Sequence, residues 1–412
     1  MISRNTLAFE ESIEAGACPT PVPFQESFGI TLFLAWLFLL TFIGRIVFAP
    51  LLPAIEREFG LSHGQAGSIF LMMSLGLFIA PVCSGFLASK INHRGALSVS
   101  ALMVGLTLLS LGFVESFRTL RLVVMIIGLA AGLHLPSAIA TITAEIRRGD
   151  WGKALGVHQS APPLAFVSAP LLVAAFIGGL SWRTILVLMG ILMLLSVTAY
   201  RLFGQGGNFS GKMPNFSIVK NIVVKPSFWI MVGLFAMAMG GTVGIYTMLP
   251  LFLVTERGMD LTWANTLLGL SQISGLFMVF IAGWVTDRIG QKTAMGVILL
   301  SGGILTMLLG VLRGRWLVAD IFVQPAFLSS FFPGAFAALA RVTPPNMRSV
   351  VSAIGPPTAF LLGGGLIPAF VGYTGETFSF SLGLIVVGCF MLGGPVLAFF
   401  LKLGEYDEAE GC

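Results

Sequence analysis

The sequence predicts an all-α membrane protein whose twelve transmembrane helices form two pseudo-symmetric six-helix bundles. Composition is the first observation behind this prediction, because hydrophobic residues make up 56% of the 412 residues and charged residues only 10%. A soluble domain carries about 25% charged residues, so most of this chain cannot face water. The second observation is that the apolar pattern of the first half returns about 200 residues later.

Twelve apolar stretches are long enough to cross a bilayer as helices. About 20 apolar residues are needed, because a helix rises about 1.5 Å per residue through about 30 Å of hydrocarbon. Only helices and closed barrels satisfy their backbone groups in lipid, and these stretches are too long and continuous for barrel strands. The predicted spans are residues 28–52, 66–88, 96–115, 120–143, 154–179, 184–203, 228–254, 264–285, 293–312, 317–340, 349–372 and 378–401.

The two halves carry the same residue types at matching places, which indicates an old duplication. The matching pairs include Gly44 and Gly244, Pro50 and Pro250, Glu56 and Glu256, Gly85 and Gly283, and Pro136 and Pro333. Two duplicated bundles that face each other across a central path are typical of secondary transporters. We therefore expect bundles at 28–203 and 228–402, joined by a linker at 204–227.

The distribution of Lys and Arg predicts the orientation in the membrane. With the N-terminus in the cytoplasm, the inner loops and tails hold about twice as many of these residues as the outer loops, as the positive-inside rule requires. The tails, at 1–27 and 403–412, and the linker are then cytoplasmic. The acid-rich start of the chain is unlike a signal peptide, and the short loops favour a bacterial inner membrane.

Other classes of function are disfavoured. The net charge of +5 comes from the loops, and no basic cluster is interleaved with aromatic residues, so no nucleic-acid partner is expected. The cysteines, at positions 18, 83, 389 and 412, have no disulfide or metal spacing, and no metal or cofactor is expected. An enzyme is disfavoured because no nucleophile–base pair or phosphate-binding loop is present. A receptor would need a sensing or output domain, which we do not find.

Two loops at matching places carry a family resemblance. Residues 283–292, after the eighth span, read Gly-Trp-Val-Thr-Asp-Arg-Ile-Gly-Gln-Lys, and residues 85–95, after the second, read Gly-Phe-Leu-Ala-Ser-Lys-Ile-Asn-His-Arg-Gly. The later loop resembles the signature of the major facilitator superfamily. The earlier loop departs from it at Ser89 and Asn92, where the family usually has Asp and Gly. The resemblance covers residues 28–402 and implies alternating access by a protein that usually acts as a monomer.

The resemblance also implies a role for these loops. In the superfamily, their contacts help to latch the cytoplasmic side shut. The residues that we expect to form this cytoplasmic gate are Asp287, Arg288, Lys90 and Arg94. The alternative is a charged turn that only sets topology.

Arg45 is the clearest ionisable residue at membrane depth. It lies about two-thirds of the way along the first span, and no acid in mid-span could neutralise it. An isolated guanidinium there costs at least about 2.5–3.5 kcal/mol. A negatively charged substrate would supply a bidentate partner. Snorkelling to the outer interface, or bonding to carbonyls at a broken helix, are the structural alternatives.

Two histidines are candidates for proton coupling, because an imidazole titrates near neutral pH. His134 lies in the fourth span and His158 near the inner end of the fifth. Each could instead be a packing residue. Gln159 could donate a hydrogen bond to a substrate carboxylate.

The second half offers fewer polar candidates. In the superfamily that the chain resembles, spans 1, 4, 7 and 10 line the central cavity. The resemblance therefore favours, as substrate-binding residues, Arg45, His134, Tyr246 and Gln324. Gln272, in the eighth span, is a further candidate. Asp320, near the outer end of the tenth span, could carry a coupling proton or pair with Arg313 or Arg315.

These features together predict a secondary active transporter of a small organic anion, coupled to protons by symport. Arg45 would hold the anion, and a histidine or Asp320 would carry the proton. Efflux of amphipathic or drug-like compounds by proton antiport is the alternative. It would use Phe and Met surfaces and need no fixed cation. The Pro162-Pro163 region only partly resembles the Gly-Pro motif of drug–proton antiporters in the superfamily.

Overall fold

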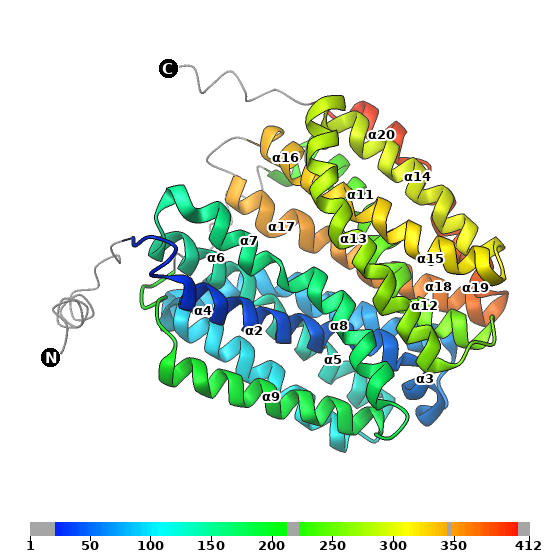
Figure 1. Ribbon diagram of the computed structural model, residues 1–412, viewed down its shortest axis with the longest axis horizontal. Helices are drawn as coiled ribbons and strands as arrows, with labels where there is room; N and C mark the ends of the chain where they lie inside the picture. The colour runs from blue at the N-terminus through cyan, green and yellow to red at the C-terminus, as the bar shows by residue number, and fades with distance from the viewer. Residues whose placement is uncertain (1–20, 212–221, 344–347, 403–412) are drawn as a thin grey trace, which may run out of the picture.

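The computed structural model describes residues 21–211, 222–343 and 348–402, and its regular elements are helices (Figure 1). Most of the predicted N-terminal tail (1–20), part of the linker (212–221), residues 344–347 and the C-terminal tail (403–412) lie outside the described residues. The helices of the first half are α2 (Phe28–Ile46), α3 (Phe48–Phe59), α4 (His63–Ser110), α5 (Phe117–Gly132), α6 (His134–Glu145), α7 (Trp151–Gln159), α8 (Ala161–Phe176) and α9 (Trp182–Phe203). Those of the second half are α11 (Pro226–Met239), α12 (Ile245–Thr255), α13 (Leu261–Ile289), α14 (Gln291–Val311), α15 (Gly314–Ser329), α16 (Phe331–Arg341), α17 (Arg348–Phe360), α18 (Ile367–Thr377), α19 (Phe380–Met391) and α20 (Gly394–Phe400).

Most of these helices join end to end into segments that suit a membrane. Ten segments in the described chain are long and apolar enough to cross one, and α13, bent by 46° within its length, makes an eleventh. Large apolar side chains are exposed along them, including Phe113 at 86% and Leu195 at 64%. Such extensive exposed apolar surface is expected where helices face lipid chains.

Helix α4 covers two of the predicted spans without a loop between them. Its 48 residues contain non-helical backbone angles at Ile91 (φ −125°, ψ 16°) and Asn92 (φ 61°, ψ 174°). The turn that we expected after the second span is therefore a two-residue break. The Asn92 side chain stabilises the helix that follows, because its Oδ1 accepts the Gly95 N–H at 2.8 Å.

The first part of the predicted linker, residues 204–211, is bound to this break. Its Gly207 carbonyl accepts the Arg94 N–H at 2.8 Å, and its Gly211 N–H donates to the Ala88 carbonyl at 3.0 Å. These bonds satisfy backbone groups that α4 leaves free where it breaks. Gly206 and Gly207 have φ values of 81° and 79°, a conformation that favours glycine.

The two bundles pack together at the end of the molecule that lies away from residues 204–211 (Figure 1). We call this end the packed end, and the opposite end the linker end. At the packed end α3 contacts α12, α4 contacts α18 and α8 contacts α13. A Cβ atom on Gly67 would lie 2.4 Å from the Pro368 carbonyl oxygen, so the bundles approach closely. The Gly64 N–H donates to the Glu376 carboxylate across this contact at 3.2 Å.

Several of the membrane-length segments break near their middle. Single residues that interrupt the first half are Val47, between α2 and α3, Leu133, between α5 and α6, and Ser160, between α7 and α8. In the second half, wider π-helical turns at Gly240–Gly244 (η3) and Leu361–Leu366 (η5) do the same. The three single residues of the first half keep helical backbone angles. Each lies three residues before a proline, whose missing N–H leaves one carbonyl of the preceding turn without its helical hydrogen bond.

Candidate functional site

Arg45 lies in the last turn of α2, two residues before the break at Val47. Its guanidinium carbon is 4.3 Å from the centroid of the Phe42 ring and 5.1 Å from that of the Phe360 ring. Phe42 belongs to the first bundle, whereas Phe360 ends α17 of the second. Within the described residues, no acid forms an ion pair with Arg45.

This arrangement suits an anion-binding arginine. Aromatic rings attract a guanidinium through their π faces. Its N–H groups point outward in the plane of the guanidinium, where a carboxylate can accept two of them. Arg45 therefore carries a positive charge that is held between the bundles and has no anionic partner from the described chain.

His134 and His158 form a buried pair beside the same helix. Their Nε2 atoms are 3.5 Å apart and their rings are nearly parallel, with an angle of 5° between the ring planes. His134 begins α6, directly after the break at Leu133, and His158 lies two residues before the break at Ser160. One nitrogen must donate and the other accept, so the neutral pair shares one proton between the rings.

Phe38 links this pair to the rest of the site. Its ring stacks on His134 at 5.1 Å and on His158 at 4.6 Å, measured between ring centroids. It also contacts Phe42 edge-on at 5.9 Å. The histidine pair and Arg45 are thus connected through two rings of α2.

A second set of ring contacts connects the site to α8 and α12. Phe166 of α8 lies 5.5 Å from Phe42 and 4.8 Å from Tyr246 between ring centroids. The Tyr246 hydroxyl donates to the Phe166 carbonyl at 3.4 Å. We call the five rings that surround this region the aromatic cluster: Phe38, Phe42, Phe166, Tyr246 and Phe360.

The sequence candidates did not include the phenylalanines of this cluster. Phe38, Phe42 and Arg45 are spaced by four and three residues, which places them on one face of a helix, and this spacing could have indicated the cluster. Phe360 comes from the other bundle, and no local pattern connects it to Arg45.

Gln324 has its hydrogen bonds within the second bundle. Its Nε2 donates to the Gly241 carbonyl at 2.8 Å and to the Thr306 hydroxyl at 3.2 Å. It therefore stabilises a carbonyl in the π-helical turn η3.

Gln272, Gln324 and Tyr246 line a cavity of about 20 Å³, enough for roughly one water molecule. Substrate binding by these two glutamines stays a prediction.

Asp320 is buried in α15, where its side chain is 4% exposed. Neither of its carboxylate oxygens has a hydrogen-bond partner among the described residues. The ion pair that we considered with Arg313 or Arg315 is not present, and that alternative was wrong. Gln159, at the end of α7, is exposed.

The predicted cytoplasmic gate is not assembled in this conformation. Asp287 is exposed, and the Arg288 guanidinium lies 3.9 Å from the Trp284 ring centroid. Lys90 is exposed on α4, and Arg94 donates to the Arg201 carbonyl at 3.0 Å. In the described ranges, no ion pair joins Asp287 or Arg288 of the second bundle to Lys90 or Arg94 of the first. The bundles are therefore closed at the packed end and not latched at the linker end.

Three curated relatives are similar to the chain at low identity. A probable sulfoacetate transporter of Cupriavidus necator is 22% identical over 65% of this chain and 67% of its own length. A 3-(3-hydroxy-phenyl)propionate transporter of Escherichia coli is 23% identical over 87% and 89%, respectively. An MFS-type efflux pump of Mycolicibacterium smegmatis is 25% identical over 76% and 77%.

A solved structure shares the fold. It is a bacterial homolog of the human lysosomal transporter Spinster, in an inward-facing and occupied conformation. The TM-score is 0.80 at 16% identity, over 93% of this chain and 97% of that one. The family model described as Major Facilitator Superfamily matches residues 34–354. The chain therefore belongs to the Major Facilitator Superfamily and is a multi-pass membrane transporter rather than an enzyme.

Proposed function

We propose that the protein is a secondary active transporter that moves a small organic anion, carboxylate-like in chemistry, together with a proton. Arg45 carries this proposal, because its guanidinium has no acidic partner in the described chain and contacts a ring from each bundle. Two relatives named for sulfoacetate and a phenylpropionate support an organic anion as the substrate class.

The topology that we propose has twelve spans. It is obtained by dividing α4 at its break and by treating bent α13 as one span. Residues 28–203 and 228–402 then form the two bundles. The excess of Lys and Arg places the tails and the 204–227 linker in the cytoplasm, and the membrane would be the bacterial inner membrane. The protein would work as a monomer.

The aromatic cluster suggests how binding is coupled to movement. An anion on Arg45 would lie close to Phe42 and Phe360, so both bundles would contribute to the same site. Rocking of the bundles would open the packed end and bring the gate residues together at the linker end. The gate would be formed by Asp287, Arg288, Lys90 and Arg94.

The proton would be carried by the His134–His158 pair, with Asp320 as the second candidate. Two cationic rings at 3.5 Å would repel each other, so the pair should take up a single proton. One proton with one monovalent anion makes the loaded step electroneutral. This removes a membrane-potential cost of about 2.3 kcal/mol per charge per 100 mV.

Uptake into proteoliposomes tests the proposal. We would measure radiolabelled small carboxylates with an inwardly directed proton gradient, for the wild type, for Arg45→Gln and for Arg118→Gln. Arg118 is an exposed arginine outside the site and serves as the matched control. We expect gradient-driven uptake in the wild type and Arg118→Gln but not in Arg45→Gln. Full pH-dependent anion uptake by Arg45→Gln would contradict the proposal.

Efflux of amphipathic compounds is the second candidate. The efflux pump among the relatives and the size of the aromatic cluster favour it. Thermal shifts with lipophilic cations separate the two functions, because a ligand that binds the folded state raises the melting temperature. Equal shifts in the wild type and Arg45→Gln, without any shift from carboxylates, would favour efflux.

A further inference from the structure

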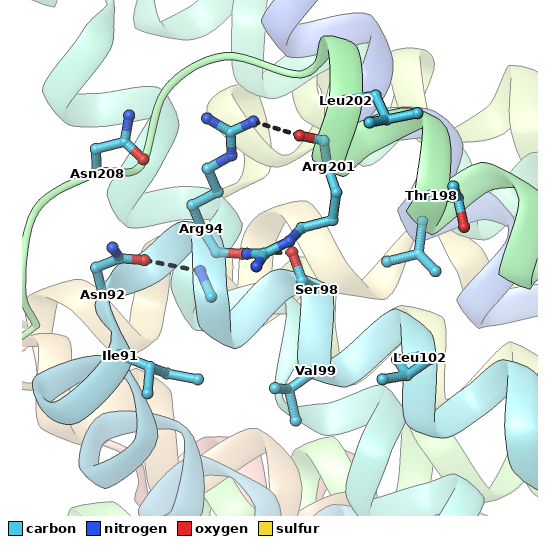
Figure 2. A pocket seen from close by; sticks show the side chains of 12 residues that line it. Ile91, Asn92, Arg94, Ser98, Val99, Leu102, Thr198, Arg201, Leu202 and Asn208 are labelled. Atoms are coloured by element: carbon cyan, nitrogen blue, oxygen red, sulfur yellow. Dashed lines mark hydrogen bonds between the residues drawn. The ribbon is translucent and has the colours of Figure 1, made fainter.

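We infer that the cavity between α4 and α9 at the linker end binds the headgroup of an anionic phospholipid (Figure 2). The cavity has a volume of about 890 Å³. Arg94 of α4 and Arg201 of α9 both line it, and among the described residues none of the others that line it is acidic. This site is separate from Arg45, shares Arg94 with the proposed cytoplasmic gate, and adds a lipid ligand to the proposed transport function.

The two arginines are available to a phosphate group. One Arg94 nitrogen, Nη2, donates to the Arg201 carbonyl at 3.0 Å. This bond holds the Arg94 side chain in place and leaves its other N–H groups available to a ligand. Arg201 is exposed, and Figure 2 shows its side chain directed towards Ser98. Neither arginine has an ion pair within the described ranges. Guanidinium groups bind phosphate oxygens through paired hydrogen bonds.

One acid lies in this region but does not occupy the cavity. Glu145 is 7% exposed, and its Oε1 accepts the Gly207 N–H at 2.9 Å. It is absent from the lining of the cavity. The charge of the lining itself is therefore positive, which complements an anionic headgroup.

The surroundings favour a lipid over a soluble anion. Leu102 and Leu202 line the cavity and are 43% and 70% exposed. Exposed Leu106 and Leu195 continue this apolar surface along the two helices. A phospholipid could place its phosphate at the arginines and its acyl chains along the leucines. Basic cavities between membrane helices on the cytoplasmic side are known sites for anionic headgroups, and we propose that the linker end is cytoplasmic.

A bound headgroup would also contact the break in α4. Asn92, at that break, and Asn208, from the bound part of the linker, line the same cavity. The lipid would therefore contact α4, α9 and residues 204–211 of the first bundle at once.

Native mass spectrometry of the intact protein in detergent tests this inference. The probes are phosphatidylglycerol, phosphatidylcholine and soluble glycerol phosphate. We expect one phosphatidylglycerol to bind more tightly than phosphatidylcholine. Arg201→Gln should weaken this binding about fivefold, which corresponds to about 1 kcal/mol for one basic residue near a membrane surface. Arg118→Gln is the control and should bind like the wild type.

A second variant keeps both arginines. Thr198 is exposed and lines the cavity, so Thr198→Trp should fill it and reduce phosphatidylglycerol binding without removing charge. Unchanged affinity in both Arg201→Gln and Thr198→Trp would overturn the inference. So would competition by glycerol phosphate at the affinity of the lipid, because the site would then bind a soluble phosphate ester.

Discussion

Asn92 and Gly290 occupy matching places in the two halves and share an unusual backbone conformation. Their φ and ψ angles are 61° and 174° for Asn92, and 82° and 150° for Gly290. Both residues separate a helix from the next one, in the two loops that carry the family signature. Side chains are rarely accommodated at such angles, so the duplication is preserved in the backbone even where the residue type differs.

Gly290→Ala should therefore destabilise the protein. A Cβ at this φ costs about 1–3 kcal/mol, and we expect a lower melting temperature in detergent. Gly283→Ala is the matched control, because Gly283 has no atom within 4 Å of an added Cβ and no positive φ. Equal melting temperatures for the two variants would contradict the prediction. Asn92→Gly should be close to neutral, since relief of strain offsets the lost hydrogen bond to Gly95.

Arg45→Lys should not restore the function that Arg45→Gln loses. Lysine keeps the charge but cannot bind a carboxylate through two parallel N–H groups or stack in the same way on Phe42 and Phe360. Loss of one hydrogen bond to a charged group is worth about 1.5–3 kcal/mol, so we expect KM for the anion to rise about 10- to 100-fold. Initial uptake rates against concentration would measure it. A wild-type KM would show that charge alone suffices.

His158→Gln should uncouple transport from the proton gradient. The amide can still form a hydrogen bond with the His134 Nε2, but it cannot accept a proton. We expect accumulation driven by a pH gradient to fall to background, while exchange of anion across the membrane without a gradient continues. His93→Gln is the control, because His93 lies at the linker end and contacts Ser137. Gradient-driven accumulation in His158→Gln would exclude His158 as the proton carrier, and accumulation in a variant that also carries His134→Gln would exclude the pair.

Asp320→Asn should leave the protein at least as stable as the wild type. The buried carboxylate has no partner among the described residues, and an ionised carboxylate is costly to bury unpaired. The uncharged amide removes this cost, so we expect an equal or higher melting temperature and retained coupling. Loss of coupling in Asp320→Asn, with His158→Gln still coupled, would instead assign the proton to this carboxyl group.

Gly67→Leu should shift the protein away from the observed conformation. An added Cβ would lie 2.4 Å from the Pro368 carbonyl oxygen, so a larger side chain prevents close contact at the packed end. We expect longer distances between spin labels placed across this end. Gly29→Leu is the control, because an added Cβ there meets nothing within 4 Å. Identical distance distributions in both variants would show that the packed end tolerates the side chain.

Much of the architecture could be predicted from the sequence, because hydrophobic length and duplication act over whole helices. The all-helical fold and the family resemblance are confirmed. The breaks at Val47, Leu133 and Ser160 have a sequence signal that our prediction did not use, because each lies three residues before a proline, at Pro50, Pro136 or Pro163. The predicted turn between the second and third spans is shorter than expected, because the two helices of α4 are separated only by the two-residue break at Ile91 and Asn92.

The candidate site was predictable only in part. Arg45 and the two histidines stand out as ionisable residues in apolar runs, and the structure connects them through Phe38 and Phe42. Gln324 was favoured because the family resemblance places the tenth span at the central cavity, yet its side chain donates to a carbonyl of the π-helical turn η3. The Gly241 carbonyl accepts this bond in a turn whose backbone is irregular. The sequence does not show this pairing, because Gly241 lies 83 residues from Gln324.

The attachment of residues 204–211 to α4 has a mechanical consequence. The connection between the bundles begins at Gly211 rather than at Gly204, because the preceding residues are hydrogen-bonded to the first bundle. Only residues 212–221 separate Gly211 from Ile222. A fully extended chain of this length spans at most about 40 Å. In the alternating access that we propose, the linker would therefore set an upper limit on how far the bundles separate at the linker end.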